Sequence, residues 1–203
     1  KGSAFDSLFL AEIIKPRILA QTPSNMLPLG TVAPHFELIN TIDNKHVSLK
    51  ENKGDFGTVI MFICNHCPFV VHVNEALVAI ANHYQKQGIS FIAISSNDAL
   101  KYPQDAPDKM NIHAQNNSYP FPYLYDESQE VAKAYDAACT PDLYVFDAEL
   151  KLVYRGQLDD SRPGNSIPVS GNDLKHALEC VLNNTKNNKP QKPSIGCNIK
   201  WKE

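Results

Sequence analysis

The sequence lacks any apolar run that approaches the roughly 20 residues needed to cross a bilayer, and it lacks a block of basic residues. An N-terminal candidate, residues 8–19, is interrupted by Glu12, Lys15, Pro16 and Arg17, unlike the core of a secretory signal. The net charge is only −3, so neither nucleic acid nor a membrane surface is an expected partner. We therefore expect a cytoplasmic protein, while a periplasmic or otherwise exported location stays open.

Cysteine is scarce, and its five copies are irregularly spaced. This is not the framework of a small secreted protein held together by disulfides, so a hydrophobic core must hold the fold. The 203 residues, of which 43% are hydrophobic, are enough for one such domain. We predict an N-terminal extension over residues 1–27, one domain over residues 28–184 and an irregular tail over residues 185–203.

Hydrophobic patterning predicts an α/β domain. Residues 57–63 and 89–95 are continuous apolar runs, typical of strands buried on both faces, and a helical apolar repeat over residues 70–84 lies between them. This strand–helix–strand unit predicts two parallel strands. Further strands are expected at 35–39, 46–49, 143–146 and 150–155, and further helices at 5–14, 108–116, 128–138 (with Ser128 as its N-cap) and 172–183.

Two cysteines lie where the first buried strand gives way to the helix, in the segment Cys64-Asn65-His66-Cys67. Two thiols at this spacing can close a small disulfide ring and reopen it. Free N–H groups and the dipole at a helix N-terminus favour the thiolate, which is the form that attacks disulfides and peroxides. The motif therefore predicts thiol redox chemistry, and we expect Cys64 to be the more acidic thiol and to lie nearer solvent.

Two other interpretations of Cys64 and Cys67 stay open. They could be an incidental buried pair, or they could bind a metal. Structural zinc sites use four ligands, usually from two such pairs, and the other cysteines are single and far apart in the sequence. Copper accepts thiolate and imidazole ligands, so a site completed by His66, His72 or His113 is chemically reasonable. The dithiol interpretation is favoured, with no metal expected.

A second motif, Cys139-Thr140-Pro141, directly precedes the strand predicted at 143–146. Proteins of the thioredoxin-like superfamily place a similar pair, with a cis peptide bond before the proline, opposite the Cys-x-x-Cys helix, and this chain resembles them in its order of elements. Residues 33–36 resemble the start of the AhpC/TSA, or peroxiredoxin, branch. The chain is most similar to peroxiredoxin-like proteins that carry a Cys-x-x-Cys, over segments 64–70, 96–98, 102–105, 139–142, 146–147, 154–160 and 196–201.

This resemblance implies a thioredoxin-like fold with a mixed central sheet flanked by helices. It implies a thiol–disulfide oxidoreductase in which Cys64 attacks a disulfide and Cys67 resolves the mixed disulfide. Thr140 and Pro141, joined by a cis peptide bond, would shape the substrate groove. The substrate would be a protein or small-molecule disulfide, and a partner dithiol would exchange electrons with the pair. No organic cofactor is implied, and the oligomeric state is not indicated.

Thiol peroxidase activity is the alternative that the same resemblance raises. Peroxiredoxins carry a Pro-x-x-x-Thr/Ser-x-x pattern before their reactive cysteine. With Cys67 in that position, Ile60 replaces the proline and Cys64 replaces the hydroxyl residue. The position of the peroxiredoxin arginine falls on Pro141, although Arg155 could substitute from the next strand. We therefore favour dithiol exchange over efficient peroxide reduction.

The remaining candidates assist this pair or lie outside it. His66 could tune Cys64 by stabilising its thiolate, and Cys139 and Cys197 are further candidate redox thiols. The tail is expected to fold back, with Trp201 as its anchor and Cys197 in a structural clasp rather than a redox role. Polar residues after the strand at 89–95 and after the strand at 150–155 favour solvated loops: Asp98, Tyr102, Asp105, Asp159, Asp160 and Arg162.

Overall fold

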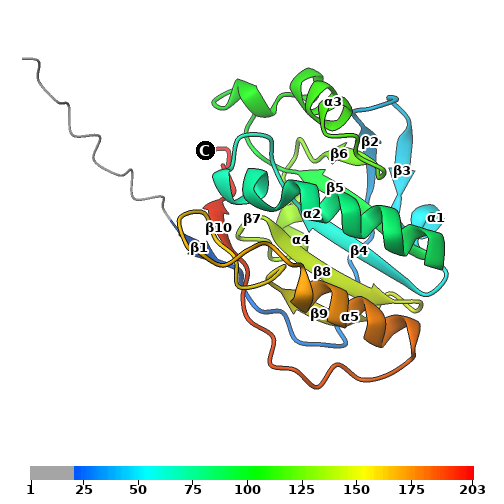
Figure 1. The fold of residues 1–203 in the computed structure, drawn as a ribbon. Helices are drawn as coiled ribbons and strands as arrows, with labels where there is room; N and C mark the ends of the chain where they lie inside the picture. The colour runs from blue at the N-terminus through cyan, green and yellow to red at the C-terminus, as the bar shows by residue number, and fades with distance from the viewer. Residues whose placement is uncertain (1–20) are drawn as a thin grey trace, which may run out of the picture.

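The computed structural model describes residues 21–203, and a seven-stranded sheet forms its centre (Figure 1). The helix expected at residues 5–14 lies outside this range. In order across the sheet, the strands are β3 (His46–Ser48), β2 (Glu37–Asn40), β6 (Tyr123–Tyr125), β5 (Ile89–Ser95), β4 (Gly57–Phe62), β8 (Asp142–Asp147) and β9 (Leu152–Gly156). None of the described helices is long and apolar enough to span a membrane.

The predicted strand–helix–strand unit is confirmed. Strands β4 and β5 pair in parallel, and α2 (Pro68–Tyr84) connects them. Proline at the first position of α2 suits a helix start, because its missing N–H has no partner there in any case. A 3-10 turn, η1 (Gln85–Gln87), follows α2, and the helical segment ends at Gly88, whose φ of 83° is left-handed. Of the other pairings in the sheet, β5–β6 is parallel and the rest are antiparallel.

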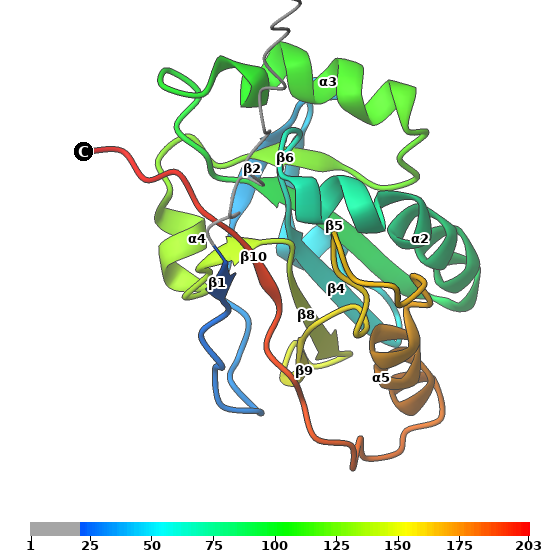
Figure 2. The same ribbon diagram turned by 60° about the vertical axis from the view of Figure 1, so that its left-hand side comes forward.

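Helices cover both faces of the sheet, as Figure 2 shows. The longer ones, α2, α3 (Pro107–Asn116) and α5 (Asn172–Leu182), contribute to one apolar core, while α1 (Leu49–Asn52) and α4 (Glu130–Ala134) contribute to the other. Strand β4 divides the two, because Val59 and Met61 point into the first core and Ile60 and Phe62 into the second. Burial on both faces explains its uninterrupted apolar sequence.

A second, smaller sheet joins both ends of the described chain to the domain. Strand β10 (Ile195–Asn198) runs antiparallel between β1 (Thr22–Pro23) and β7 (Cys139–Thr140). Gly196 permits this close approach, because a Cβ there would come within 1.9 Å of the Thr140 carbonyl oxygen. The prediction that the tail folds back is confirmed. Its buried anchor is Ile199, with 1% exposure, and not Trp201, which is 39% exposed.

Two local expectations were wrong. The helix predicted at 128–138 is only α4, and its N-cap is Gln129, in a left-handed conformation with φ of 65°, instead of Ser128. The buried Asp126 carboxylate explains the shift, because it accepts the Ala132 N–H at 2.9 Å and so fixes the start of the helix from outside. The short strands β1, β6, β7 and β10 were not predicted, since segments of two to four residues carry little periodicity.

The tail anchor leads to a stability prediction. Ile199→Ala removes a buried side chain and should lower the free energy of unfolding by about 2–4 kcal/mol. Trp201→Ala is the matched control on the same segment and should cost less than about 1 kcal/mol, because the indole is largely exposed. Urea unfolding of both variants measures the difference. Equal losses would show that Ile199 is not the residue that holds the tail.

Candidate active site

The end of β4 and the start of α2 position the two cysteines of the Cys-x-x-Cys motif. The Ile63 N–H still bonds the Ile94 carbonyl at 3.0 Å, so the chain leaves the sheet just before Cys64. Cys67 is the N-cap residue of α2. Both thiols are free and buried, with 2% exposure for Cys64 and 0% for Cys67. Cys64 is the slightly more exposed of the two, in the expected order, but strands from elsewhere in the chain cover this junction and leave neither thiol open to solvent.

Thr140 contacts both thiols. Its peptide bond to Pro141 is cis, as predicted. Its hydroxyl oxygen lies 3.5 Å from the Cys64 sulfur, and its carbonyl oxygen lies 3.1 Å from the Cys67 sulfur, whose S–H it accepts when Cys67 is protonated. These two contacts hold β7 against the junction of β4 and α2. They also make Thr140 the residue through which Cys64 and Cys67 contact the smaller sheet.

A third thiol reaches the same place from the C-terminal tail. In the antiparallel pairing of β10 with β7, Cys197 lies opposite Thr140 and Asn198 opposite Cys139. The half-buried Cys197 packs against the core cluster that contains Cys64 and Cys67, and it is near enough to Cys67 for the two thiols to alter each other's pKa. Cys139 points elsewhere, because its S–H donates to the Pro141 carbonyl at 3.6 Å, and burial raises its pKa. The fold thus brings together three of the four candidate redox cysteines and leaves Cys139 aside.

Hydrogen bonding shifts the pKa values of Cys67 and Cys64 in opposite directions. The pKa of Cys67 is lowered, first because Cys197 donates to its sulfur, then because Cys64 does so, with the Val70 N–H of α2 adding to the effect. The pKa of Cys64 is raised, because it donates to Cys67, is buried, and faces the Asp105 carboxylate. The expected order of acidity is therefore reversed. Cys67, at the helix N-cap, is the thiol that ionises first, and Cys64 is the thiol that keeps its proton to higher pH.

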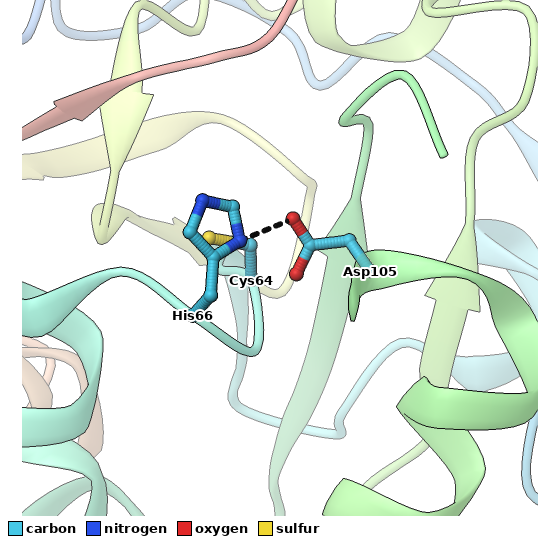
Figure 3. A group of neighbouring side chains, drawn as sticks. All are labelled: Cys64, His66 and Asp105. Atoms are coloured by element: carbon cyan, nitrogen blue, oxygen red, sulfur yellow. Dashed lines mark ion pairs between the residues drawn. The ribbon is translucent and has the colours of Figure 1, made fainter. Parts of the chain in front are cut away.

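An acidic residue that the sequence assigned to a solvated loop lies beside Cys64 instead (Figure 3). Asp105 ends the 3-10 turn η2 (Pro103–Asp105) and is fully buried. One carboxylate oxygen accepts the Asn65 N–H at 2.9 Å, and the other lies 2.8 Å from the Asn97 amide nitrogen and 2.7 Å from His66 Nδ1. Asp105 therefore fixes the loop between the two cysteines.

One signal for Asp105 was present in the sequence. The loop that carries it follows β5, which is parallel to β4, and the carboxyl ends of adjacent parallel strands meet at one edge of a sheet. The polar segment after β5 had to lie near the Cys64 turn for that reason. Its proline-rich composition does not reveal which of its side chains turns inward. Asp98 is also buried, with 4% exposure, contrary to the solvated-loop expectation.

The described residues offer three possible metal ligands at this site, fewer than the four of a structural zinc site. Cys64, His66 and Asp105 bring one sulfur, one nitrogen and one oxygen within 4.8 Å of one another. The other histidines considered for copper have partners elsewhere, since His72 bonds Ser161 at 2.7 Å and His113 bonds Tyr119 at 3.1 Å. The Asp105 oxygens already hold three protein groups, so the cluster suits positioning better than a four-ligand site.

Two charged residues lie outside the cysteine cluster. Arg155 is fully buried, pairs with Asp142 at 3.0 Å and stacks on the Tyr144 ring at 4.4 Å. Tyr144 belongs to the core on the opposite face of the sheet from Cys64, so Arg155 does not substitute for the peroxiredoxin arginine. Asp159 is also buried, since it accepts N–H groups of Ser161, Ser170 and Gly171, so the expectation of a solvated cluster was wrong there.

Comparison with known proteins agrees with this architecture. Residues 29–155 match the AhpC/TSA family. An uncharacterized conserved protein from Geobacillus kaustophilus is 60% identical, with a TM-score of 0.88 over 90% of this chain and 96% of that one. A hypothetical protein from Sinorhizobium meliloti is 46% identical, with a TM-score of 0.87 over 89% and 98%.

More distant structures share the fold alone. The thioredoxin domain of a thiol-disulfide oxidoreductase from Bacteroides vulgatus is 18% identical, with a TM-score of 0.54 over 64% of this chain and 89% of that one. No curated protein matches the chain. The family match covers more than half of the sequence and lies within the domain that has the thioredoxin-like fold. The chain therefore belongs to the AhpC/TSA family, and its fold is thioredoxin-like.

Proposed function

We propose that the protein is a thiol–disulfide oxidoreductase whose redox group is the Cys64–Cys67 pair. The observation that carries this proposal is the meeting of both thiols at Thr140, between the end of β4 and the N-cap of α2. A thiolate held by a helix N-terminus beside a second thiol is the arrangement that disulfide exchange needs. The AhpC/TSA family match supports redox chemistry of this class.

Proton positions suggest how the exchange begins. The Cys67 thiolate accepts the Cys64 S–H, so it can take that proton as Cys64 attacks one sulfur of a substrate disulfide. The other substrate sulfur leaves as a thiolate, and a mixed disulfide remains on Cys64. Cys67 then passes its proton to the departing thiolate and attacks Cys64. The products are the Cys64–Cys67 disulfide and a substrate reduced by two electrons; in the reverse direction the protein is an oxidant.

The space around Cys64 and Cys67 limits the size of the substrate that can reach them. The crevice beside Pro141, lined also by Phe69 and Ile195, has a volume of only about 20 Å³, which leaves room for about one water and not for a disulfide substrate. Strand β10 already pairs with the Thr140 edge. A protein disulfide therefore requires displacement of β10, and Thr140 and Pro141 would line the groove that opens. Electrons would come from a partner dithiol.

His66 and Asp105 assist as positioning residues in this proposal. Asp105 holds the Asn65 N–H and His66 Nδ1, which fixes the turn that presents Cys64. Its negative charge opposes a thiolate on Cys64, so the proton stays there until Cys67 removes it. His66, with 28% of its side chain exposed, is then available beside Cys64 to the leaving group of the substrate.

Thiol peroxidase is the second candidate, and the burial of both thiols favours it, because a peroxide is small enough to reach a sulfur that a protein cannot. The hydroxyl and guanidinium groups that would polarise the peroxide are replaced by Cys64 and Pro141. Peroxide consumption by the reduced protein, measured beside the reduction of insulin disulfides, separates the two candidates. Faster turnover of peroxide than of disulfide would favour the peroxidase.

The central prediction concerns the cysteine variants. The reduced wild-type protein should reduce insulin disulfides, Cys64→Ser should abolish turnover, and Cys67→Ser should accumulate a mixed disulfide on Cys64 because nothing resolves it. Peptide mapping by mass spectrometry identifies the link. Cys180→Ser is the matched control, because Cys180 lies on α5, away from the cluster, and its loss should leave turnover unchanged. Full turnover by Cys64→Ser would refute the proposal.

A pH dependence follows from the altered acidities. The lowered pKa of Cys67 makes the reduced protein more stable as pH rises toward about 8.5, the value of an unfolded cysteine. Above that pH the trend reverses, because Cys64 and Cys197, whose pKa values are raised, keep protons that the unfolded chain loses. Urea unfolding under reducing conditions measures the curve. Cys67→Ser should lack the rise above the pH range in which Asp43, Asp108 and Asp160 titrate, and a rise that persists there would assign the thiolate elsewhere.

The role of Asp105 is tested in a Cys67→Ser background, where Cys64 titrates without its thiol partner. Adding Asp105→Asn should lower the pKa of Cys64, because the opposing carboxylate charge is gone while the amide oxygen still accepts the Asn65 N–H. The pH dependence of the alkylation rate of Cys64 reports this shift. Asp108→Asn, on the exposed start of α3, is the control. An unchanged Cys64 profile would leave Asp105 with a purely structural role.

A further inference from the structure

A third sulfur lies beside Cys67 on the side away from its helix. Cys197 is opposite Thr140 in the antiparallel pairing, and the carbonyl oxygen of Thr140 lies 3.1 Å from the Cys67 sulfur. Opposed residues in such a pair have Cα atoms only about 4.5–5.5 Å apart. Cys197 packs against the core that contains both other thiols, and Cys197 and Cys67 alter each other's pKa. Thr140 therefore places both Cys64 and Cys197 beside Cys67.

We propose that Cys64, Cys67 and Cys197 form a three-thiol relay, in which the disulfide moves between Cys64–Cys67 and Cys67–Cys197 and an external dithiol reduces it at Cys197. The proposal rests on the proposed function, because that function supplies the Cys64–Cys67 disulfide. It assigns to the C-terminal strand a reaction in addition to its structural role.

The transfer step needs no outside oxidant or reductant. The Cys197 thiolate attacks the Cys67 sulfur of the Cys64–Cys67 disulfide, the Cys67–Cys197 bond forms, and the bond to Cys64 breaks. Cys64 leaves with the electron pair and takes up the proton that Cys197 released. The number of disulfides is unchanged, and Cys64 is again a thiol facing the substrate side.

Acidities favour this direction once the first disulfide has formed. In the reduced protein the Cys67 charge holds the Cys197 proton and raises the pKa of Cys197. That charge disappears when Cys67 enters a disulfide, so the main cause of the raised pKa is removed. The Lys200 ammonium, which lowers the pKa of Cys197, then acts with less opposition. Cys197 becomes a better nucleophile at the moment when its target exists.

Exposure identifies Cys197 as the sulfur that a reductant reaches. It is half-buried, whereas Cys64 is 2% exposed and Cys67 is not exposed. A thiolate of the partner dithiol would attack Cys197, and Cys67 would leave; its low pKa makes it the better leaving group. The partner's second thiol then breaks the mixed disulfide, which restores Cys197 as a thiol and oxidises the partner.

The decisive variant is Cys64→Ser, in which the relay can form only its second disulfide. Mild oxidation with diamide should remove two hydrogens from the monomer, and peptide mapping should find Cys67 linked to Cys197. Cys64→Ser/Cys180→Ser is the matched control and should give the same link, since α5 is remote from the cluster. A variant with no intramolecular link, or with Cys67 joined to another cysteine, would overturn the relay.

Wild-type protein separates failure of the relay from failure of the proposed function. After oxidation, acid quenching and alkylation, both Cys64–Cys67 and Cys67–Cys197 peptides should be found, and Cys197→Ser should retain only the first. Finding Cys64–Cys67 in the wild type without Cys67–Cys197 in Cys64→Ser would overturn the relay and leave the oxidoreductase intact. The absence of Cys64–Cys67 from the wild type would overturn both. Dithiothreitol should also reduce oxidised Cys197→Ser more slowly than oxidised wild type, and equal rates would contradict the entry of electrons at Cys197.

Discussion

The contact of Thr140 with Cys64 and Cys67 is the constraint on which the rest of the site depends. A two-residue strand, β7, meets the junction of β4 and α2 through one hydroxyl and one carbonyl. The same residue pairs with Cys197 along its other edge. The β4–α2 junction, β7 and β10 are far apart in sequence, and Thr140 is the position at which they meet. The relative positions of the three sulfurs therefore depend on Thr140.

Burial of these thiols restricts which of them can ionise. Three neighbouring thiols, two of them buried, cannot all be ionised, and hydrogen bonding from Cys197 and then Cys64, with the Val70 N–H of α2 adding to it, makes Cys67 the most acidic. Asp105 strengthens that choice from the other side, because its carboxylate opposes a thiolate on Cys64. Reactivity then depends on moving a proton within the cluster rather than on exposing a thiolate to solvent.

The sequence predicted those features that arise from long, regular patterns or from a recognisable motif. The buried strands and α2 followed from continuous and helical apolar runs, and the cis bond before Pro141 followed from family resemblance. What it missed is set by tertiary contacts of single residues. Three features depend on neighbours more than 30 positions away in the chain. They are the inward orientation of Asp105, the burial of Ile199 instead of Trp201 as the tail anchor, and the lowered pKa of Cys67. Local sequence carries no signal for such neighbours.

Strand β10 follows every other part of the site in the sequence, and this order has a consequence for synthesis. Gly196 allows it to dock on the Thr140 carbonyl, yet β4, α2 and β7 are all made first. A nascent chain that extends only as far as β9 therefore lacks the strand that pairs with the Thr140 edge, and this edge can be covered only after the last segment has been made.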